Sequence, residues 1–248
     1  MTTEEDSELD SPAFLDYFSP DIYLARRTAY TTVLNRTVEQ IFRENGVRGD
    51  RLVHIPNGVN VKKFDTISET ECERVRRKYR LGDRPVVFFA GTIMPRKGVA
   101  ELVQAASQVV SAAPEETEFV IAGETDLDED YMNRVQAIIR ENKIDTKITF
   151  TGYLEDADLL PMYQTSCAFV LPSYEEGFGM VVSEAMAAGT TPVASRISGI
   201  KQQINHGTTG IMVDPGDAGE LADAIINLLE DPEKRQRMEE RSQKRARQ

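Results

Sequence analysis

From residue 85 to the end of the chain, short apolar strands alternate with amphipathic helices. Val86–Ala90 and Ala168–Leu171 are unbroken apolar runs, rich in β-branched and aromatic residues, as expected of strands that are covered on both faces. Helical periodicity fills the intervals between such runs, for example over residues 98–112 and 128–142. This alternation predicts a doubly wound α/β domain, in which helices cover both faces of a parallel sheet.

The other expected elements of this domain follow in the same order. Ligands bind beyond the carboxyl ends of the strands in such sheets, so a site is expected where a turn directly follows a strand. Residues 91–98 and 172–179 are two such turns. The remaining strands are expected over residues 118–122, 148–150, 191–194 and 211–213, and the remaining helices over residues 156–165, from about 179, over 217–230 and over 232–246.

The part of the chain before this pattern is organised differently. Residues 1–20 are acidic, contain two prolines and are expected to be poorly ordered. Residues 21–60 are predicted to be a small remnant of another domain, and residues 61–248 form the main domain, which begins with a helix and a loop within residues 66–83. Within the remnant we expect, in order, a helix over 21–28, a strand over 29–34, a helix over 35–44 and a strand over 51–55.

The composition excludes several classes of protein. The formal net charge is −12, so no basic surplus is present to neutralise the phosphates of a nucleic acid. Cys72 and Cys167 lie far apart, without the spacing of a disulfide framework or a metal site, which favours a reducing, cytoplasmic compartment. With only two histidines and no apolar run of membrane length, the sequence predicts neither a histidine-based metal site nor a membrane span.

Residues 172–189 bring the most chemistry together. Glu176 and Glu184 stand eight positions apart, and between them a Gly-Phe-Gly turn at residues 177–179 opens a helix. The turn lets a ligand approach the backbone, and the unpaired N–H groups and positive dipole end of the helix suit a phosphate. The carboxylates repel phosphate and suit hydroxyls instead. The combination predicts a nucleotide sugar, which has a diphosphate in the middle and hydroxyls at both ends.

A basic pair, Arg96 and Lys97, follows the strand at Val86–Ala90. Such a pair can neutralise a diphosphate, with lysine as a point charge and arginine as a fork of donors. The alternative interpretation is an exposed basic loop, just as an exposed helix position is the alternative for Glu184. Against that alternative, Glu184 is flanked by the apolar residues Val181, Val182, Ala185 and Met186.

The chain resembles the retaining glycosyltransferases of the GT-B fold, most closely the large family 4 group. That family has two Rossmann-like domains, of which the C-terminal one holds the nucleotide sugar and the N-terminal one mostly holds the acceptor. The resemblance covers about residues 25–248 and implies that the main domain is the C-terminal, donor-binding half. The segments that carry it are Ile55-Pro56-Asn57-Gly58-Val59, Ala90-Gly91-Thr92 with Arg96-Lys97-Gly98, Phe150-Thr151-Gly152-Tyr153-Leu154 and residues 172–189, followed by Pro192-Val193-Ala194 and residues 207–213.

The resemblance assigns roles to the residues that match. Glu176 would contact the donor sugar and hold charge near the reacting carbon, and Glu184 would accept hydrogen bonds from the ribose. Lys97 and Arg96 would bind the diphosphate, with Arg96 replacing an arginine that many relatives carry at the position of Thr92. Glu176, Lys97 and Arg96 are the expected catalytic residues. The expected substrate-binding residues are Gly91, Arg96, Lys97, Tyr153, Leu154, Glu176, Gly177, Phe178, Gly179, Met180 and Glu184, with Tyr153 and Leu154 beside the base.

The implied reaction is transfer of a sugar from a UDP-, GDP- or ADP-sugar to an acceptor, with retention of configuration and without a metal or any cofactor besides the donor substrate. The chain looks truncated at both ends relative to the family, so a lost segment or a partner chain would supply the acceptor domain. Two other functions are alternatives. A donor-binding half-domain that is inactive alone would share all of these residues, whereas a GT-B sugar-nucleotide epimerase is expected to lack the Glu-Glu-Gly-Phe-Gly segment at residues 175–179. A phosphorylase would need a lysine for pyridoxal phosphate, and the sequence offers no site for one.

Overall fold

The structure is a computed structural model that describes residues 20–113 and 116–248. The chain forms two compact units, residues 1–57 and residues 58–248. Apart from Pro20, the acidic leader expected over residues 1–20 lies outside the described residues.

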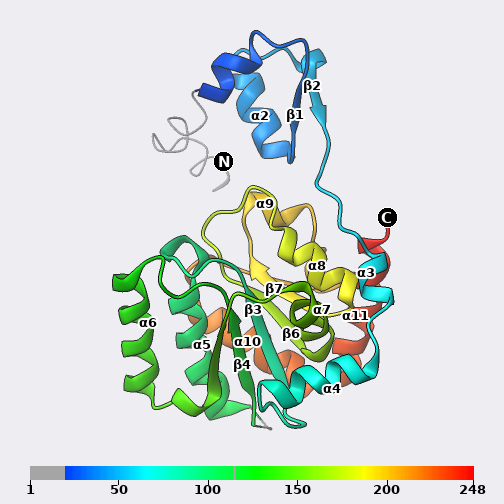
Figure 1. The fold of residues 1–248 in the computed structure, drawn as a ribbon. Helices are drawn as coiled ribbons and strands as arrows, with labels where there is room; N and C mark the ends of the chain where they lie inside the picture. The colour runs from blue at the N-terminus through cyan, green and yellow to red at the C-terminus, as the bar shows by residue number, and fades with distance from the viewer. Residues whose placement is uncertain (1–19, 114–115) are drawn as a thin grey trace. The chain divides into compact units, whose positions relative to one another are not determined.

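The first unit contains a strand–helix–strand motif, preceded by a helical stretch at residues 20–25 (Figure 1). The two strands pair in parallel, with Thr31 opposite Leu52. The Asn35 side chain accepts a hydrogen bond from Val38 N at 2.9 Å and so caps the connecting helix, as expected. The elements are β1 (Thr31–Val33), α2 (Arg36–Glu44), η2 (Gly49–Arg51) and β2 (Leu52–His54). They share a small apolar core of Ile22, Ala25, Val33, Ile41, Phe42, Val47 and Leu52.

The second unit is built on a six-stranded sheet in which every neighbouring pair of strands is parallel. The order across the sheet is β5-β4-β3-β6-β7-β8. The chain therefore builds outward from β3 in one direction and from β6 in the other, and these two strands are neighbours where the order reverses, with Val87 opposite Ala168. The strands are β3 (Val86–Ala90), β4 (Glu118–Ala122), β5 (Ile148–Gly152), β6 (Ala168–Leu171), β7 (Thr191–Ser195) and β8 (Ile211–Val213).

Helices cover both faces of this sheet (Figure 1). They are α3 (Lys62–Asp65), α4 (Glu69–Lys78), α5 (Val99–Ala112), α6 (Glu129–Asn142), α7 (Asp156–Thr165), α8 (Met180–Ala188), α9 (Ser198–Lys201), α10 (Ala218–Glu230) and α11 (Pro232–Ala246), with the short 3-10 helices η3 (Pro95–Lys97) and η4 (Asp145–Lys147). One layer consists of α5 with α6 and α10, and the other of α7 with α4 and α8, together with α11 against α8. The predicted doubly wound parallel sheet is confirmed.

Aromatic side chains pack where β3 and β6 meet. The ring of Tyr163 from α7 stands edge-to-face to Phe88 of β3, with centroids 5.2 Å apart, and 5.3 Å from Phe169 of β6. All three side chains are fully buried. Such ring pairs contribute about 0.5–1.5 kcal/mol beyond the area they bury. The cluster therefore fixes α7 over the centre of the sheet and sets the position of the Tyr163 hydroxyl.

A charged network ties α7 to α4. The carboxylate of Asp158, which is almost buried, accepts hydrogen bonds from Arg74 Nη1 at 2.6 Å, from Lys78 Nζ and from Tyr79 OH at 3.0 Å. Burial by itself raises the pKa of Asp158, but the hydrogen bonds from Lys78, Arg74 and Tyr79 outweigh burial and lower the pKa to about 2. Asp158 is therefore ionised at neutral pH and links the two helices.

Candidate functional site

The turns after β3 and β6 lie side by side at the carboxyl edge of the sheet, where the strand order reverses. Tyr174 N donates to Arg96 O at 2.8 Å, which joins the two turns directly. Gly98 has φ 68°, and a Cβ on it would stand 2.1 Å from Pro172 O. Only glycine fits there, because any side chain would both strain the backbone and push the turns apart. The two predicted turns thus meet at the edge where ligands bind in such sheets.

Lys97 and Glu176 form an ion pair between these two turns. Lys97 Nζ lies 2.5 Å from Glu176 Oε1, and the two side chains are 12% and 9% exposed. Ser173 Oγ donates to the same carboxylate oxygen at 2.9 Å. Among the described residues nothing donates to Glu176 Oε2, so this oxygen is left to accept a hydrogen bond from a hydroxyl. Ser173 is a site residue that the sequence did not reveal, although it lies only three positions before Glu176.

The Gly-Phe-Gly turn presents main-chain donors at the start of α8. Gly179 caps this helix with φ 75°, and a Cβ on it would meet Ile200 Cδ1 at 2.6 Å. Within the described part of the chain, neither Phe178 N nor Gly179 N has an acceptor. The positive end of the helix dipole and these N–H groups make the turn suited to an anion. Phe178 itself is buried, so its ring offers a ligand little exposed surface.

Glu184 lies about one helical turn into α8, four residues after Met180, and is half-buried. Tyr163 OH donates to Glu184 Oε2 at 2.9 Å. Burial raises the pKa of Tyr163 well above its ordinary value, and the charge of Glu184 and the hydrogen bond to it add to the effect. The phenol therefore stays protonated and acts as the donor. Sequence reasoning missed Tyr163, although a buried tyrosine implies some partner for its hydroxyl.

The other predicted site residues differ in how far they are available to a ligand. Arg96 is exposed, and its guanidinium has no partner among the residues described. Tyr153 is 69% exposed, whereas Leu154 is 5% exposed and belongs to the core, so only its backbone could reach a base. Gly91 N donates to Ala122 O at 3.0 Å and is used by the sheet. Met180, half-buried, is the first residue of α8.

The structure thus gathers the predicted residues into three groups. Direct contacts unite Lys97 and Glu176 with the turn at residues 172–179. Glu184 stands further along α8 with Tyr163. Tyr153 and Leu154 follow β5, the edge strand of the sheet, so they lie at the same carboxyl edge but outside the first group.

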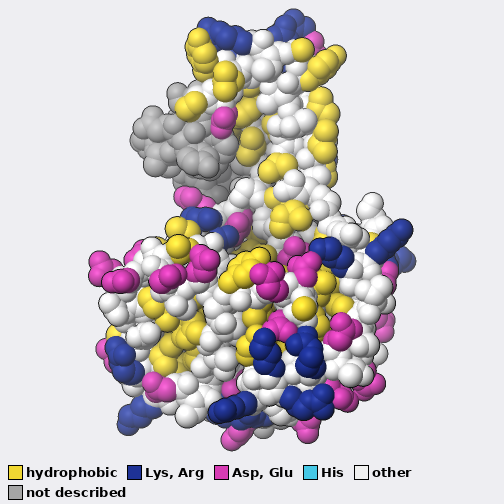
Figure 2. All heavy atoms as spheres, viewed as in Figure 1, with side chains coloured by type: hydrophobic (Ala, Val, Ile, Leu, Met, Phe, Trp, Pro, Cys, Tyr) yellow, Lys and Arg dark blue, Asp and Glu magenta, His cyan; other side chains and the backbone are white. Residues whose placement is uncertain are grey.

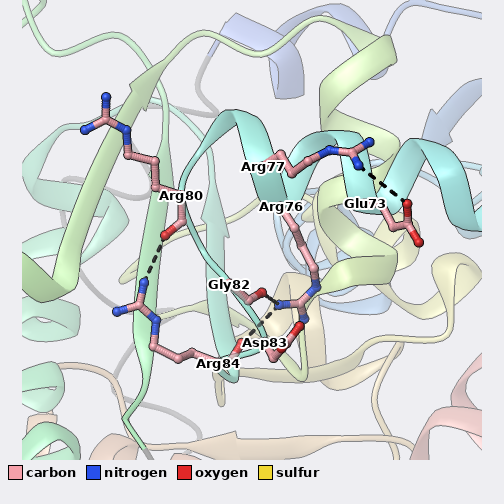
Figure 3. Close-up of a pocket in the computed structure, with 7 residues that line it drawn as sticks. All are labelled: Glu73, Arg76, Arg77, Arg80, Gly82, Asp83 and Arg84. Atoms are coloured by element: carbon pink, nitrogen blue, oxygen red, sulfur yellow. Dashed lines mark hydrogen bonds and ion pairs between the residues drawn. The ribbon is translucent and has the colours of Figure 1, made fainter.

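A cavity of about 500 Å³ lies elsewhere, beside the connection from α4 to β3 (Figure 3). Its wall is mostly arginine, and Lys and Arg side chains gather over this region of the surface (Figure 2). Arg76 donates to Gly82 O at 2.6 Å and to Thr165 O at 3.1 Å, and Arg84 donates to Arg80 O at 2.9 Å. These arginines brace the entry into β3, at the amino edge of the sheet, and the cavity is not part of the site. The lining residues are Glu73, Arg76, Arg77, Arg80, Gly82, Asp83 and Arg84.

Within residues 20–113 and 116–248, no three His, Cys, Asp or Glu side chains are placed to hold a metal ion together. No helix in the described part of the chain combines the length and the apolar character needed to cross a membrane.

Comparison with known proteins shows that this chain is similar to glycosyltransferases. A family model described as "Glycosyl transferases group 1" matches residues 72–245. Alpha-D-kanosaminyltransferase of Streptomyces kanamyceticus is 30% identical over 219 residues, which cover 88% of this chain and 55% of that protein. D-inositol 3-phosphate glycosyltransferase of Corynebacterium efficiens is 30% identical over 195 residues, covering 76% and 45%. The chain spans about half the length of the curated relatives it matches.

Solved structures share the fold. The crystal structure of Anabaena HepE in complex with UDP and glucose has a TM-score of 0.87 and 23% identity, and the match covers 95% of this chain and 64% of HepE. The C-terminal domain of LpcC, a glycosyl transferase group 1 family protein of Francisella tularensis, has a TM-score of 0.66 and 23% identity, with 77% of this chain and 97% of that domain covered. The predicted fold, with the sheet domain as the C-terminal half of a GT-B fold, is confirmed.

Proposed function

Because this chain belongs to the group 1 glycosyl transferases, we propose that it transfers a sugar from a nucleotide-sugar donor to an acceptor, with retention of the anomeric configuration. In this reaction the bond from the anomeric carbon to the diphosphate breaks, and a new bond to an acceptor hydroxyl forms on the same face of the sugar. The observation that carries the proposal is the junction of the turns that follow β3 and β6, where Lys97 of one turn pairs with Glu176 of the other, just before the start of α8.

The leaving diphosphate is the part of the donor that suits these two turns best. Lys97 and Arg96 supply positive charge from one turn, and the N–H groups of Phe178, Gly179 and Met180 supply donors from the other. Charge develops on the diphosphate as the glycosidic bond breaks, and donors already in place stabilise that charge without reorganising. Arg96 has no partner to give up within the described residues, so its guanidinium is free to follow the phosphate.

The two carboxylates serve the two hydroxyl-rich ends of the donor. Glu176 is proposed to face the sugar. Its Oε2, to which no described residue donates, accepts a hydrogen bond from a hydroxyl, and its charge lies near the positive carbon of the transition state. Lys97 and Ser173 hold its other oxygen. Glu184 accepts hydrogen bonds from the ribose, while Tyr163 holds one of its oxygens. Tyr153 and the backbone of Leu154 are proposed to border the base.

The donor is a UDP-, GDP- or ADP-sugar, and it is the substrate; no further cofactor is invoked. HepE, whose fold this chain shares, was crystallised with UDP and glucose, which supports a diphosphate donor of this size. The proposed location is the cytoplasm, where nucleotide sugars are available and both thiols would stay reduced.

A second candidate function is a donor-binding half-domain that needs a partner chain or a further segment for turnover. The observation in its favour is that the first unit contributes only two strands within the described residues, whereas the second has a complete six-stranded sheet. A GT-B sugar-nucleotide epimerase is the remaining alternative, and product analysis distinguishes it from a transferase.

Calorimetry on the full chain with UDP, GDP, ADP and their sugars tests the donor site. We expect one of the nucleotides to bind. Glu184→Ala should weaken its binding, and Lys97→Met should weaken binding of the nucleoside diphosphate more than binding of the nucleoside. Glu176→Gln should weaken binding of the nucleotide sugar. Glu175→Gln, which changes the exposed neighbouring residue, should leave that binding unchanged. Absence of heat with every donor, for wild type and Glu184→Ala alike, would refute the donor site. Efficient transfer by this chain alone would refute the half-domain alternative.

A further inference from the structure

A glutamine outside the predicted site holds the turn that the diphosphate is proposed to use. Gln203 follows α9 and is 7% exposed. Its Nε2 donates to Phe178 O and, at 3.1 Å, to Gly199 O, and its Oε1 accepts from Ser183 Oγ at 2.6 Å. Because main-chain carbonyls only accept hydrogen bonds, these partners determine which end of the side-chain amide faces the turn.

The hydrogen bond to Phe178 O also orients a donor. In a planar trans peptide the C=O and the N–H of one unit point in opposite directions. Phe178 O and Gly179 N belong to the same unit, so Gly179 N–H points away from Gln203. No described residue accepts this N–H, which stands at the N-cap of α8 on the positive side of the helix dipole.

The residues on either side of Phe178 make the backbone of this turn flexible. Gly177 and Gly179 flank Phe178, and glycine rotates more freely about its backbone bonds than any other residue. A peptide next to such residues can flip, and a flip would exchange the N–H donor for a carbonyl oxygen that repels phosphate. The hydrogen bond from Gln203 Nε2 to Phe178 O opposes this flip.

Gln203 is in turn held by the last helix. Arg245 of α11 donates from Nε to Gln203 O at 2.5 Å and from Nη2 to Gln202 O at 2.7 Å. The two bonds form a fork on consecutive carbonyls and fix the backbone after α9. A continuous set of contacts therefore runs from Arg245 through Gln203 to the Phe178–Gly179 peptide.

We propose that Gln203 is a positioning residue that keeps the N–H of Gly179 directed at the donor's diphosphate, and that Arg245 supports it. The inference rests on the proposed function and adds two residues that touch no donor atom. Neither residue lies in a segment that the sequence marked as functional.

The decisive variant is Gln203→Met, which keeps the length of the side chain and removes both of its polar groups. Binding to the full chain is measured by calorimetry for the nucleoside diphosphate that wild type prefers among UDP, GDP and ADP, and for the matching nucleoside. The diphosphate should bind about tenfold more weakly, as for loss of one hydrogen bond to a charged oxygen, with the nucleoside unchanged. Arg245→Met should cause a smaller loss of the same selectivity.

The matched control is Gln243→Met. Gln243 also donates from Nε2 to a main-chain carbonyl, Ala187 O at 3.4 Å, but at the far end of α8. This variant should bind both ligands like wild type. Urea unfolding of each variant establishes that it is folded under the binding conditions, and Arg245→Met carries the test if Gln203→Met does not fold.

A second readout needs no ligand. The carbonyl ¹³C resonance of Phe178 reports the hydrogen bond it accepts, and it should shift in Gln203→Met and stay in Gln243→Met. Diphosphate affinity equal to wild type in folded Gln203→Met, or an equal loss for the nucleoside, would overturn the proposal. An unchanged Phe178 resonance would overturn it as well. If wild type binds no nucleotide, the proposed function is refuted. The Phe178 resonance then shows separately whether the hydrogen bond from Gln203 to Phe178 O exists.

Discussion

Replacing Asp158 by asparagine should destabilise the fold in a pH-dependent way. The hydrogen bonds from Lys78, Arg74 and Tyr79 outweigh burial and lower the pKa of Asp158 from 3.8 to about 2. A depression of about 1.8 units corresponds to about 2.4 kcal/mol. Arg74 and Lys78 are 43% and 53% exposed, so solvent screening reduces this figure, and we expect Asp158→Asn to lose about 1–2 kcal/mol at pH 7.

The sign follows from the order of protonation. The unfolded chain, with the higher pKa at Asp158, takes up the proton first as the pH falls. The stabilisation is therefore complete above about pH 5, about half of it remains near pH 3, and most is lost near pH 2. The difference in unfolding free energy between wild type and Asp158→Asn should shrink over the same range.

Urea unfolding followed by circular dichroism, at pH 7, 5 and 3, measures this difference by linear extrapolation. Asp156→Asn is the matched control, because Asp156 also lies in the first turn of α7 but is 62% exposed and, among the described residues, pairs only with Lys63, at 2.7 Å. It should change stability by less than about 0.5 kcal/mol. An equal loss for the two variants, or a difference for Asp158→Asn that is the same at pH 7 and pH 3, would refute the reasoning.

Three further predictions concern single side chains. Tyr163→Phe should weaken nucleoside diphosphate binding about three- to tenfold, because it releases Glu184. This loss should vanish with a 2′,3′-dideoxy analogue, which lacks the ribose hydroxyls. The control Tyr131→Phe removes a buried hydroxyl that accepts from Ala100 N, and it should not affect binding. Gly98→Ala should cost at least about 2 kcal/mol in urea unfolding, more than Gly152→Ala, which has a similar φ of 69° but open space around it. Burial raises the pKa of Cys167 to about 11, so Cys72→Ser should show no rapid thiol reaction with a disulfide reagent at pH 8 until urea unfolds it; rapid labelling of the native variant would contradict this.

Much of the main domain is predictable because its central strands, β3 and β6, are covered on both faces and are apolar throughout. Every residue of β3 and β6 is buried, which is the pattern that located them. β5 was expected to end at residue 150 but extends to Gly152, because Thr151 and Gly152 carry no apolar signal. The strand predicted over residues 29–34 is shorter in the structure, at Thr31–Val33. The helices α3 and α9 were not predicted, because four residues are too few to show a helical period.

The motifs located the main elements of the site, but not how its side chains pair. Lys97 and Glu176 were assigned to different parts of the donor, and their ion pair depends on β6 lying beside β3, an order that no local pattern encodes. Tyr163 and Gln203 reach the site from α7 and from the segment after α9. A buried tyrosine or glutamine needs a hydrogen-bond partner, but only the packing of the folded chain decides which group that partner is.

The neighbouring positions of β3 and β6 also have a consequence for folding. These strands are adjacent in the sheet although α5, β4, α6, β5 and α7 separate them in the sequence. Such a long-range pairing carries a large loop-closure cost and forms slowly compared with local contacts. A ligand that touches both turns can bind only after β3 and β6 have paired. Its binding then stabilises the paired state by mass action. Nucleotide binding should therefore serve as a late reporter of refolding, acquired after helical circular dichroism has recovered.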